Sequence, residues 1–192
     1  MCCRYYCARR GFYRVAKELA VESDSSFIRQ EGEIRPDDSA SIITAGNGRL
    51  AFAEAKWGFV GKQGNLIINA RAETALEKPM FRASIMTRRC LIPSEKFYEW
   101  DYSKNIAEFT DAAKAIIYLA GLWYIYENIM RFTVLTVAAN ESVLPVHDRM
   151  PLMIAAADAR RWVLDNNTFQ DLLSKEMPAL NVFRAQEQMT MF

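Results

Sequence analysis

The chain begins Met1-Cys2-Cys3-Arg4, so a cysteine directly follows the initiator methionine. Initiator methionine is usually removed when a small residue comes next, and its removal would leave Cys2 with a free α-amine and a free thiol on adjacent carbons. Such a 1,2-aminothiol condenses with an aldehyde to close a five-membered thiazolidine ring. The reference pKa of an α-amine is about 7.7–8.0 and that of a thiol is about 8.5, so a usable fraction of each is nucleophilic near neutral pH. Position 2 alone does not decide the matter, because a cysteine can also stand there by accident.

A carboxylate lies between aromatic residues in the segment Phe97-Tyr98-Glu99-Trp100. If this segment is a strand with Glu99 facing inward, burial disfavours the charged form, raises the carboxyl pKa and makes Glu99 a proton donor or acceptor near neutral pH. The alternative is a period-2 strand that turns Glu99 toward water. Residues 97–100 alone leave both interpretations open.

Two further polar stretches stand where packing alone would favour apolar side chains. Asn69 and Arg71 follow an apolar run, and Arg71 offers a planar fork of donors suited to phosphate. For the neighbouring Glu73 we favour a salt bridge or a helix-start acid. The only histidine, His147, lies in the proline-flanked segment Pro145–Pro151, in a stiff polar loop after a strong strand, where functional residues concentrate.

The 192-residue chain carries a net charge of +1, so its overall charge does not indicate a polyanionic partner. The first fourteen residues contain no acid and four arginines: Arg4, Arg9, Arg10 and Arg14. A local arginine cluster beside a possible nucleophile fits a phosphate-bearing substrate, but it also fits a solvated basic end. Composition alone does not favour either interpretation over the other.

The four cysteines predict reduced thiols in a cytoplasmic protein, since no secretory segment precedes them and the chain is long enough to fold without disulfides. A zinc site is disfavoured because paired CxxC spacing is missing and the single histidine is distant in sequence. We expect neither a metal nor another cofactor. The apolar run over residues 116–125 is too short to span a membrane and indicates a buried strand.

The hydrophobic pattern predicts a single α+β domain over residues 1–192, with a mainly antiparallel β-sheet or barrel-like core and flanking helices. A loop or short turns are expected over 23–48. Helices are expected over 12–22, 73–77, 80–89, 156–164 and 168–175. Strands are expected over 50–54, 57–60, 66–69, 90–92, 96–102, 116–126, 131–138, 151–154 and 180–183, with Glu127-Asn128 turning a hairpin.

Taken together, four of these features resemble one family. Cys2 after Met1, the segment Asn69–Thr74, the segment Phe97–Trp100 and His147-x-Arg149-Met-Pro151 occur in the order seen in SRAP proteins, also called SOS response-associated peptidases or abasic site processing proteins. The resemblance extends from residue 2 to about residue 185. It departs at Cys3, where the family usually has glycine, and at residues 41–45, which lack the family's Tyr-Asn-x-x-Pro segment.

The resemblance implies a SRAP-like fold, and it implies a protein that binds single-stranded DNA with an abasic site and captures the sugar aldehyde covalently through Cys2. It implies catalytic roles for Cys2, Asn69, Glu99 and His147. It also implies that Arg4, Arg71 and Arg149 hold phosphates and that Trp57 stacks on an unpaired base, with Lys56 adding charge. We expect a monomer that joins the nucleoid when DNA is damaged.

Two other functions stay open from the sequence. One is a cysteine-type peptidase, acting on itself or on other proteins through an N-terminal cysteine nucleophile. The other is a single-stranded DNA binder without catalysis. The covalent mechanism requires the Cys2 end to be exposed, with residues 69, 99 and 147 close to it.

Overall fold

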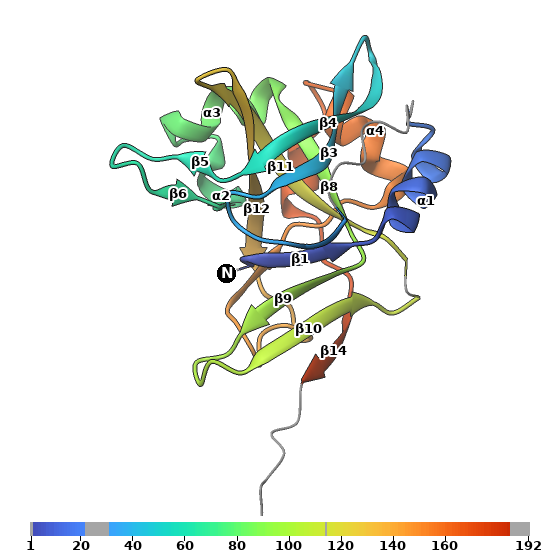
Figure 1. Ribbon diagram of the computed structural model, residues 1–192, viewed down its shortest axis with the longest axis vertical. Coiled ribbons are helices and arrows are strands. Elements are labelled where there is room, and N and C mark those ends of the chain that lie inside the picture. Colours follow the sequence, from blue (N-terminus) through green and yellow to red (C-terminus); the bar gives the residue numbers. More distant parts are fainter. Residues whose placement is uncertain (1, 22–30, 114, 185–192) are drawn as a thin grey trace, which may run out of the picture.

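The computed structural model describes residues 2–21, 31–113 and 115–184 (Figure 1). Its helical segments are α1 (Arg9–Leu19), α2 (Ala72–Ala75), α3 (Pro79–Thr87), η2 (Ala156–Asp158), α4 (Ala159–Leu164) and η3 (Gln170–Ser174). Among the described residues, no helix has both the length and the apolar character needed to cross a membrane.

The strands form two main sheets and a small hairpin. They are β1 (Arg4–Cys7), β2 (Gly32–Ile34), β3 (Ser39–Gly46), β4 (Arg49–Trp57), β5 (Phe59–Val60), β6 (Leu66–Ile67), β7 (Asn69–Arg71), β8 (Arg89–Ser94), β9 (Lys96–Trp100), β10 (Ile106–Asp111), β11 (Ile117–Tyr126), β12 (Ile129–Ala138), β13 (Arg149–Pro151) and β14 (Leu180–Arg184). The α+β fold with a largely antiparallel, barrel-like core is therefore as predicted.

Five strands close into a barrel. The pairing runs β11-β8-β3-β4-β12, and β12 pairs back with β11. The β12–β4 pair is parallel and the other four pairs are antiparallel, so the barrel is mixed. Strands β7 and β13 extend β12 beyond the ring, and they carry three of the residues that the sequence analysis singled out, Asn69, Arg71 and Arg149.

A second sheet lies against the barrel in the order β14-β10-β9-β1-β2, with every neighbouring pair antiparallel (Figure 1). Its inner face is mainly apolar and includes Tyr5, Phe97 and Phe109, each with at most 1% of its surface exposed. The Tyr5 ring packs on barrel residue Trp57 with 5.3 Å between centroids. Strand β1 therefore connects the amino-terminal end of the chain to both layers.

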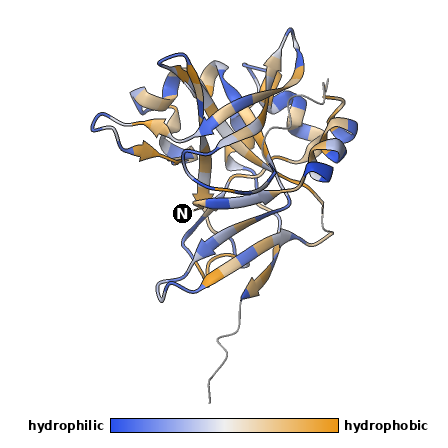
Figure 2. Cartoon of the chain, in the orientation of Figure 1, coloured by the Kyte–Doolittle hydropathy of each residue, from blue (hydrophilic) through white to orange (hydrophobic). Residues whose placement is uncertain are grey.

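Local sequence explains two of the elements directly. Phe12, Val15 and Leu19 recur at helical spacing and form the buried side of α1, while Figure 2 shows hydrophilic residues interleaved with them. In the β11–β12 hairpin, Glu127 and Asn128 have φ values of 49° and 61°. Two consecutive positive φ values are typical of a tight type I′ turn, whose twist matches that of the flanking strands.

Several predicted elements need correction. The predicted helix exists, but it runs over 9–19 and not 12–22. The prediction of a loop over 23–48 is wrong at β2 and β3, while its residues 23–30 lie outside the described part of the chain. Strand β10 was not predicted, and residues 170–174 form a 3₁₀ helix. Most of β3 is buried, with Ala40 through Thr44 all covered, so this strand lacks the alternation that identifies a half-exposed strand.

Candidate active site

Cys2 lies immediately before β1 and has none of its surface exposed. Its thiol is 3.6 Å from the carbonyl oxygen of Arg4, and its own carbonyl oxygen accepts a 2.8 Å hydrogen bond from Nδ2 of Asn69. Burial, and after it the charge of Glu99, raises the pKa of the Cys2 thiol well above its usual range. The expectation of an exposed Cys2 end is therefore wrong for the chain that still carries Met1: this thiol is buried and protonated.

Glu99 is on the inner face of β9. Phe97 and Glu99 point inward, while Lys96, Tyr98 and Trp100 alternate with them and are half-exposed. Only 1% of Glu99 is exposed, and this burial raises its pKa to about 7, with Asp148 adding to the rise. The inward-facing interpretation thus holds and the water-facing alternative does not.

Glu99 also lies close to both amino-terminal thiols. Its charge contributes to the raised pKa of Cys2 and of the half-exposed Cys3. Register explains the proximity: Arg4 pairs with Tyr98 across the antiparallel β1–β9 ladder, so the residues just before Arg4 meet those just after Tyr98. A buried carboxyl group with a pKa of about 7 therefore lies close to one buried thiol, that of Cys2, and one half-exposed thiol, that of Cys3.

His147 completes the group from the loop that precedes β13. Its Nδ1 accepts a 3.0 Å hydrogen bond from the backbone N–H of Arg149, which assigns the proton of the neutral ring to Nε2. The same Nδ1 is 2.9 Å from Oδ1 of Asp148, a contact that attracts only when the ring is protonated. Burial lowers the pKa of His147, which favours the neutral form. Since Asp148 also acts on Glu99, this loop and strand β9 belong to one site.

Asn69 and Arg71 are both on β7, beside the parallel partner strand β12. The Asn69 side chain turns inward to Cys2, whereas Arg71 is exposed. Together with Lys78 they line a pocket of about 330 Å³ whose apolar surface includes Ile67 and Phe81. Lys78 was not singled out from the sequence; the turn between α2 and α3 brings it beside Arg71.

Arg149 is already engaged within the protein. Its guanidinium forms a bidentate ion pair with Glu73, at 2.7 Å and 2.8 Å, and donates to the carbonyl oxygen of Thr136 at 2.6 Å. These hydrogen bonds lower the pKa of Glu73, which confirms the salt bridge favoured for that residue. These internal contacts do not support the prediction that Arg149 holds a phosphate, and they fix β13, the strand that follows His147.

Trp57 is not a stacking platform. It is fully buried, stacks on Phe132 at 6.0 Å, and donates its indole N–H to the carbonyl oxygen of Ile68 at 2.9 Å. The prediction that its ring contacts an unpaired base is wrong, because closure of the barrel turns this end of β4 inward. Its neighbour Lys56 is half-buried in the same strand, opposite Arg131 of β12.

Arg4 occupies the outer face of β1, two residues after Cys2. Its guanidinium carbon is 4.8 Å from the ring centroid of Trp100, and its Nε is 3.4 Å from Glu33. The structure thus brings Cys2, Asn69 and Glu99 together with the His147 loop, and it places Arg4 at their edge. Sequence reasoning missed Asp148 and the aromatic residues around Arg4, which become visible only once β1 and β9 are paired.

The fold and the site first define a class: an α+β domain with a mixed barrel, in which a cysteine at position 2 meets a buried acid that titrates near pH 7. Comparison with known proteins then identifies the family. A family model described as SOS response associated peptidase (SRAP) matches residues 1–190, and the chain belongs to this family.

Relatives agree with this assignment, and solved structures share the fold. The chain is 30% identical to abasic site processing protein YoaM of Bacillus subtilis, covering 87% of this chain and 83% of that protein. It is 32% identical to YoqW of the same organism, with 87% and 84% covered. Crystal structures of proteins from Bordetella bronchiseptica and Bacteroides thetaiotaomicron share the fold, both with a TM-score of 0.80, at 22% and 18% identity; they cover 96% and 97% of this chain and 100% and 93% of their own.

Proposed function

We propose that this protein processes abasic sites in single-stranded DNA by forming a covalent thiazolidine crosslink through Cys2 after Met1 has been removed. The relatives YoaM and YoqW are named for abasic site processing, and the ring-opened sugar of an abasic site is an aldehyde. The observation that carries the proposal is the position of Glu99, a buried carboxyl group with a pKa of about 7 that faces the thiols of Cys2 and Cys3.

The reaction consists of two bond-forming steps. The α-amine of Cys2 adds to C1′ of the open sugar, and loss of one water gives an imine. The Cys2 thiol then adds to the same carbon and its proton passes to the imine nitrogen, which closes the ring. The overall change is one water lost per crosslink.

Glu99 would move the protons in both steps. Near neutral pH about half of this carboxyl group is protonated, so it can donate to the departing hydroxyl and accept the thiol proton. Neutral His147 carries its proton on Nε2 and would donate it to a sugar oxygen. Asn69 holds the Cys2 carbonyl group and so orients the amine that Met1 removal frees.

The buried state of Cys2 fits a dormant precursor. While Met1 is attached, the Cys2 nitrogen is an amide and cannot form an imine. The thiol is also protonated, because burial raises its pKa. Removal of Met1 therefore has to precede reaction, and we expect it to increase access to this end of the chain.

The alternative of a cysteine peptidase acting on other proteins has less support. A thiol protease needs a thiolate, whereas the environment of Cys2 favours the neutral thiol. His147 accepts a backbone hydrogen bond through Nδ1, so that nitrogen is not available to take a thiol proton. Removal of the chain's own Met1 is compatible with either function.

A denaturing gel tests the proposal. Purified protein is incubated with a single-stranded oligonucleotide that contains one abasic site, and a slow-migrating band is expected that is missing with intact DNA. Cys2→Ala should abolish the band, and Cys3→Ser, which keeps Cys2, should retain it. Equal crosslinking by Cys2→Ala would disprove the mechanism. A shift on native gels alone would indicate a binder, and cleavage of a supplied peptide without DNA would indicate a peptidase.

A further inference from the structure

A second pocket, larger than the one beside Arg71, lies at the far end of β10 from the candidate active site. Its volume is about 800 Å³, which is within the range of pockets that hold small organic ligands. Ala107 of β10 pairs with Glu99, whereas Asp111, four residues further along the strand, lines this pocket. At about 3.3 Å per residue, the two positions on β10 are about 13 Å apart.

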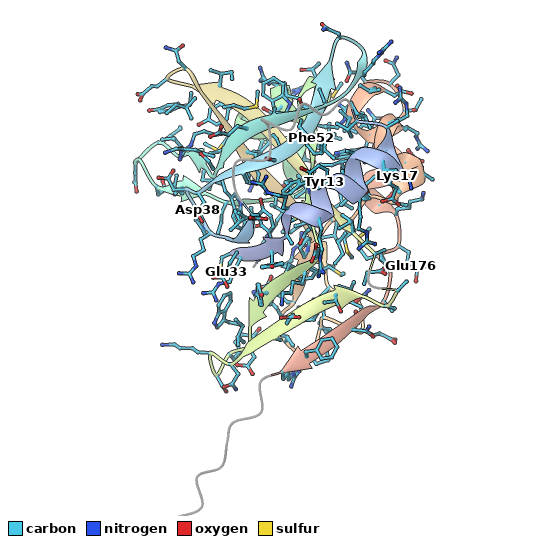
Figure 3. All side chains as sticks on the ribbon, turned by 45° about the vertical axis from the view of Figure 1, so that its right-hand side comes forward. Tyr13, Lys17, Glu33, Asp38, Phe52 and Glu176 are labelled. Carbon is cyan, nitrogen blue, oxygen red and sulfur yellow. The ribbon has the colours of Figure 1, made fainter. Side chains whose placement is uncertain are left out.

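The pocket and the edge of the active site lie on different sides of the molecule. Figure 3 shows Glu176, which lines the pocket, on the side that also carries Lys17 of α1, and it shows Glu33 on the opposite side. Glu33 contacts Arg4 at the edge of the candidate active site. A ligand of this pocket therefore does not need to share space with DNA that reaches Cys2.

The floor of the pocket is apolar and mostly covered. Two of its side chains are unbranched thioethers, and Sδ of Met177 accepts a 3.2 Å hydrogen bond from the backbone N–H of Met153. Methionine side chains adapt to apolar groups of different shapes. The rim includes the exposed residues Lys175, Glu176 and Pro178. The floor residues, each at most 8% exposed, are Ile116, Ile117, Met153, Ile154, Met177 and Leu180.

Two carboxylates in the lining are held in orientation by hydrogen bonds. Oδ1 of Asp111 accepts the backbone N–H groups of Ala113 at 2.8 Å and of Ala115 at 3.1 Å. Oε2 of Glu18 accepts the hydroxyl of Tyr118 at 2.6 Å, and only 3% of Tyr118 is exposed. Burial, and after it this hydrogen bond, raises the pKa of Tyr118 above its usual range, so the hydroxyl remains a donor. A carboxylate has about four lone-pair sites, so both groups retain acceptor capacity for a ligand.

The polar part of the lining therefore consists mainly of acceptors. Glu176 adds a third carboxylate, and Lys175, the one cation among the described lining residues, is already paired with Asp158. A ligand that fits this lining brings hydrogen-bond donors. A cationic donor is favoured over a neutral one because charge-assisted hydrogen bonds are the stronger ones, and an anionic ligand is repelled.

We propose that this pocket binds a small organic amine. The apolar body of the amine lies on the floor residues, and its ammonium group donates to the carboxylates of Glu18 and Asp111. This site is separate from the proposed reaction at Cys2 and does not depend on it.

A titration without DNA tests the proposal, so its outcome is independent of abasic site processing. The probe is 4-phenylbutylamine, with 4-phenylbutanoate as a control of opposite charge and the same carbon body. In ¹H–¹⁵N NMR spectra of the intact protein, the amine should bind with a Kd of about 1 mM or lower. It should shift the amides of residues 115–118, 153–156 and 175–177. The carboxylate should bind about tenfold more weakly. Equal binding of the two compounds, or shifts confined to other residues, would overturn the proposal.

Variants test the two anchoring carboxylates. Glu18→Gln/Asp111→Asn removes both charges but keeps side-chain oxygens that accept the existing hydrogen bonds, and it should weaken amine binding about tenfold. Asp101→Asn is the matched control. Asp101 accepts two backbone N–H groups in the same way, in the turn before β10, and it does not line the pocket. Wild-type affinity in the double variant, with a native circular dichroism spectrum, would overturn the proposal.

A lysine side chain of a partner protein presents the same ammonium group on an apolar stem. The peptide acetyl-Leu-Lys-Leu-amide separates this source from a small molecule, and it should bind more weakly than 4-phenylbutylamine. Tighter binding of the peptide would overturn the assignment to a small amine and would indicate a docking site for a protein.

Discussion

Two buried ionisable residues, Arg89 and Glu99, have opposite surroundings. Arg89 begins β8, is 1% exposed and stays charged, with a pKa of about 10 because of its burial. Its guanidinium stacks over Phe169 at 4.0 Å. Its donors make hydrogen bonds of 2.6–2.9 Å to oxygen atoms of Ile85, Met86, Trp162, Asp165 and Asn166. Arg89 therefore connects α3, α4 and the barrel.

Glu99 is equally buried, and its burial together with the negative charge of Asp148 disfavours the carboxylate and outweighs the amino-terminal charge, which favours it. Its pKa rises to about 7 as a result. The comparison teaches that burial of a charge does not by itself indicate function. The guanidinium of Arg89 donates hydrogen bonds to several fixed oxygen atoms, so Arg89 has a structural role. The surroundings of Glu99 disfavour its negative charge, which suits this residue for proton transfer.

The largest expected effect concerns Arg89. Arg89→Met should destabilise the fold by about 3–5 kcal/mol, because several buried carbonyl oxygens lose their donors at once. Urea unfolding followed by circular dichroism measures the change. Arg82→Met, at an exposed position on α3, is the control and should stay within about 0.5 kcal/mol of wild type. Similar losses of unfolding free energy in both variants would show that the hydrogen bonds of Arg89 do not stabilise the fold specifically.

The next effect is the pH dependence of stability. Because the Glu99 pKa rises from its usual 4.5 to about 7 on folding, the folded state holds this proton more tightly than the unfolded state does. Stability from this residue is therefore complete below pH 4.5 and falls by about 3 kcal/mol as the pH rises through 7. Unfolding titrations of wild type and Glu99→Gln across this range should converge at low pH. Parallel curves would contradict the raised pKa.

Catalysis provides the complementary test of Glu99. Glu99→Gln removes proton transfer but keeps the shape of the side chain, so crosslinking should slow about 100-fold while binding to intact single-stranded DNA changes less than twofold. Rates come from gel time courses and binding from anisotropy. Equal losses in rate and affinity would mean that Glu99 is structural, like Arg89.

A smaller effect is expected at Asn69. Asn69→Ala removes the 2.8 Å hydrogen bond to the Cys2 carbonyl, which should cost about 1 kcal/mol of stability and slow crosslinking about tenfold. Unfolding titrations measure the loss of stability, and gel time courses measure the rate of crosslinking. Unchanged crosslinking in a variant that has lost this stability would remove Asn69 from the positioning of Cys2.

The smallest effect concerns salt. Arg71→Ala should weaken single-stranded DNA binding a few-fold and reduce the slope of log affinity against log salt by about 1. Titrations at several salt concentrations measure the slope in this variant and in wild type, and an unchanged slope in Arg71→Ala would argue against a phosphate contact.

The sequence was sufficient for features that depend on local chemistry. The β11–β12 hairpin followed from Glu127-Asn128 between β-branched strands. For Glu99 the sequence left a buried and a water-facing position open, and only the packing of β9 settles that it is buried with a raised pKa. Features set by long-range pairing could not be predicted. Barrel closure buries Trp57, and the β1–β9 register brings Arg4 over Trp100, although more than ninety residues separate them.

Mass spectrometry of the amino-terminal peptide after incubation with an abasic oligonucleotide tests the central claim most directly. The account predicts a peptide that begins at Cys2, lacks Met1 and carries the sugar remnant on Cys2 with the loss of one water. An adduct on any other residue, or on a chain that retains Met1, would contradict it.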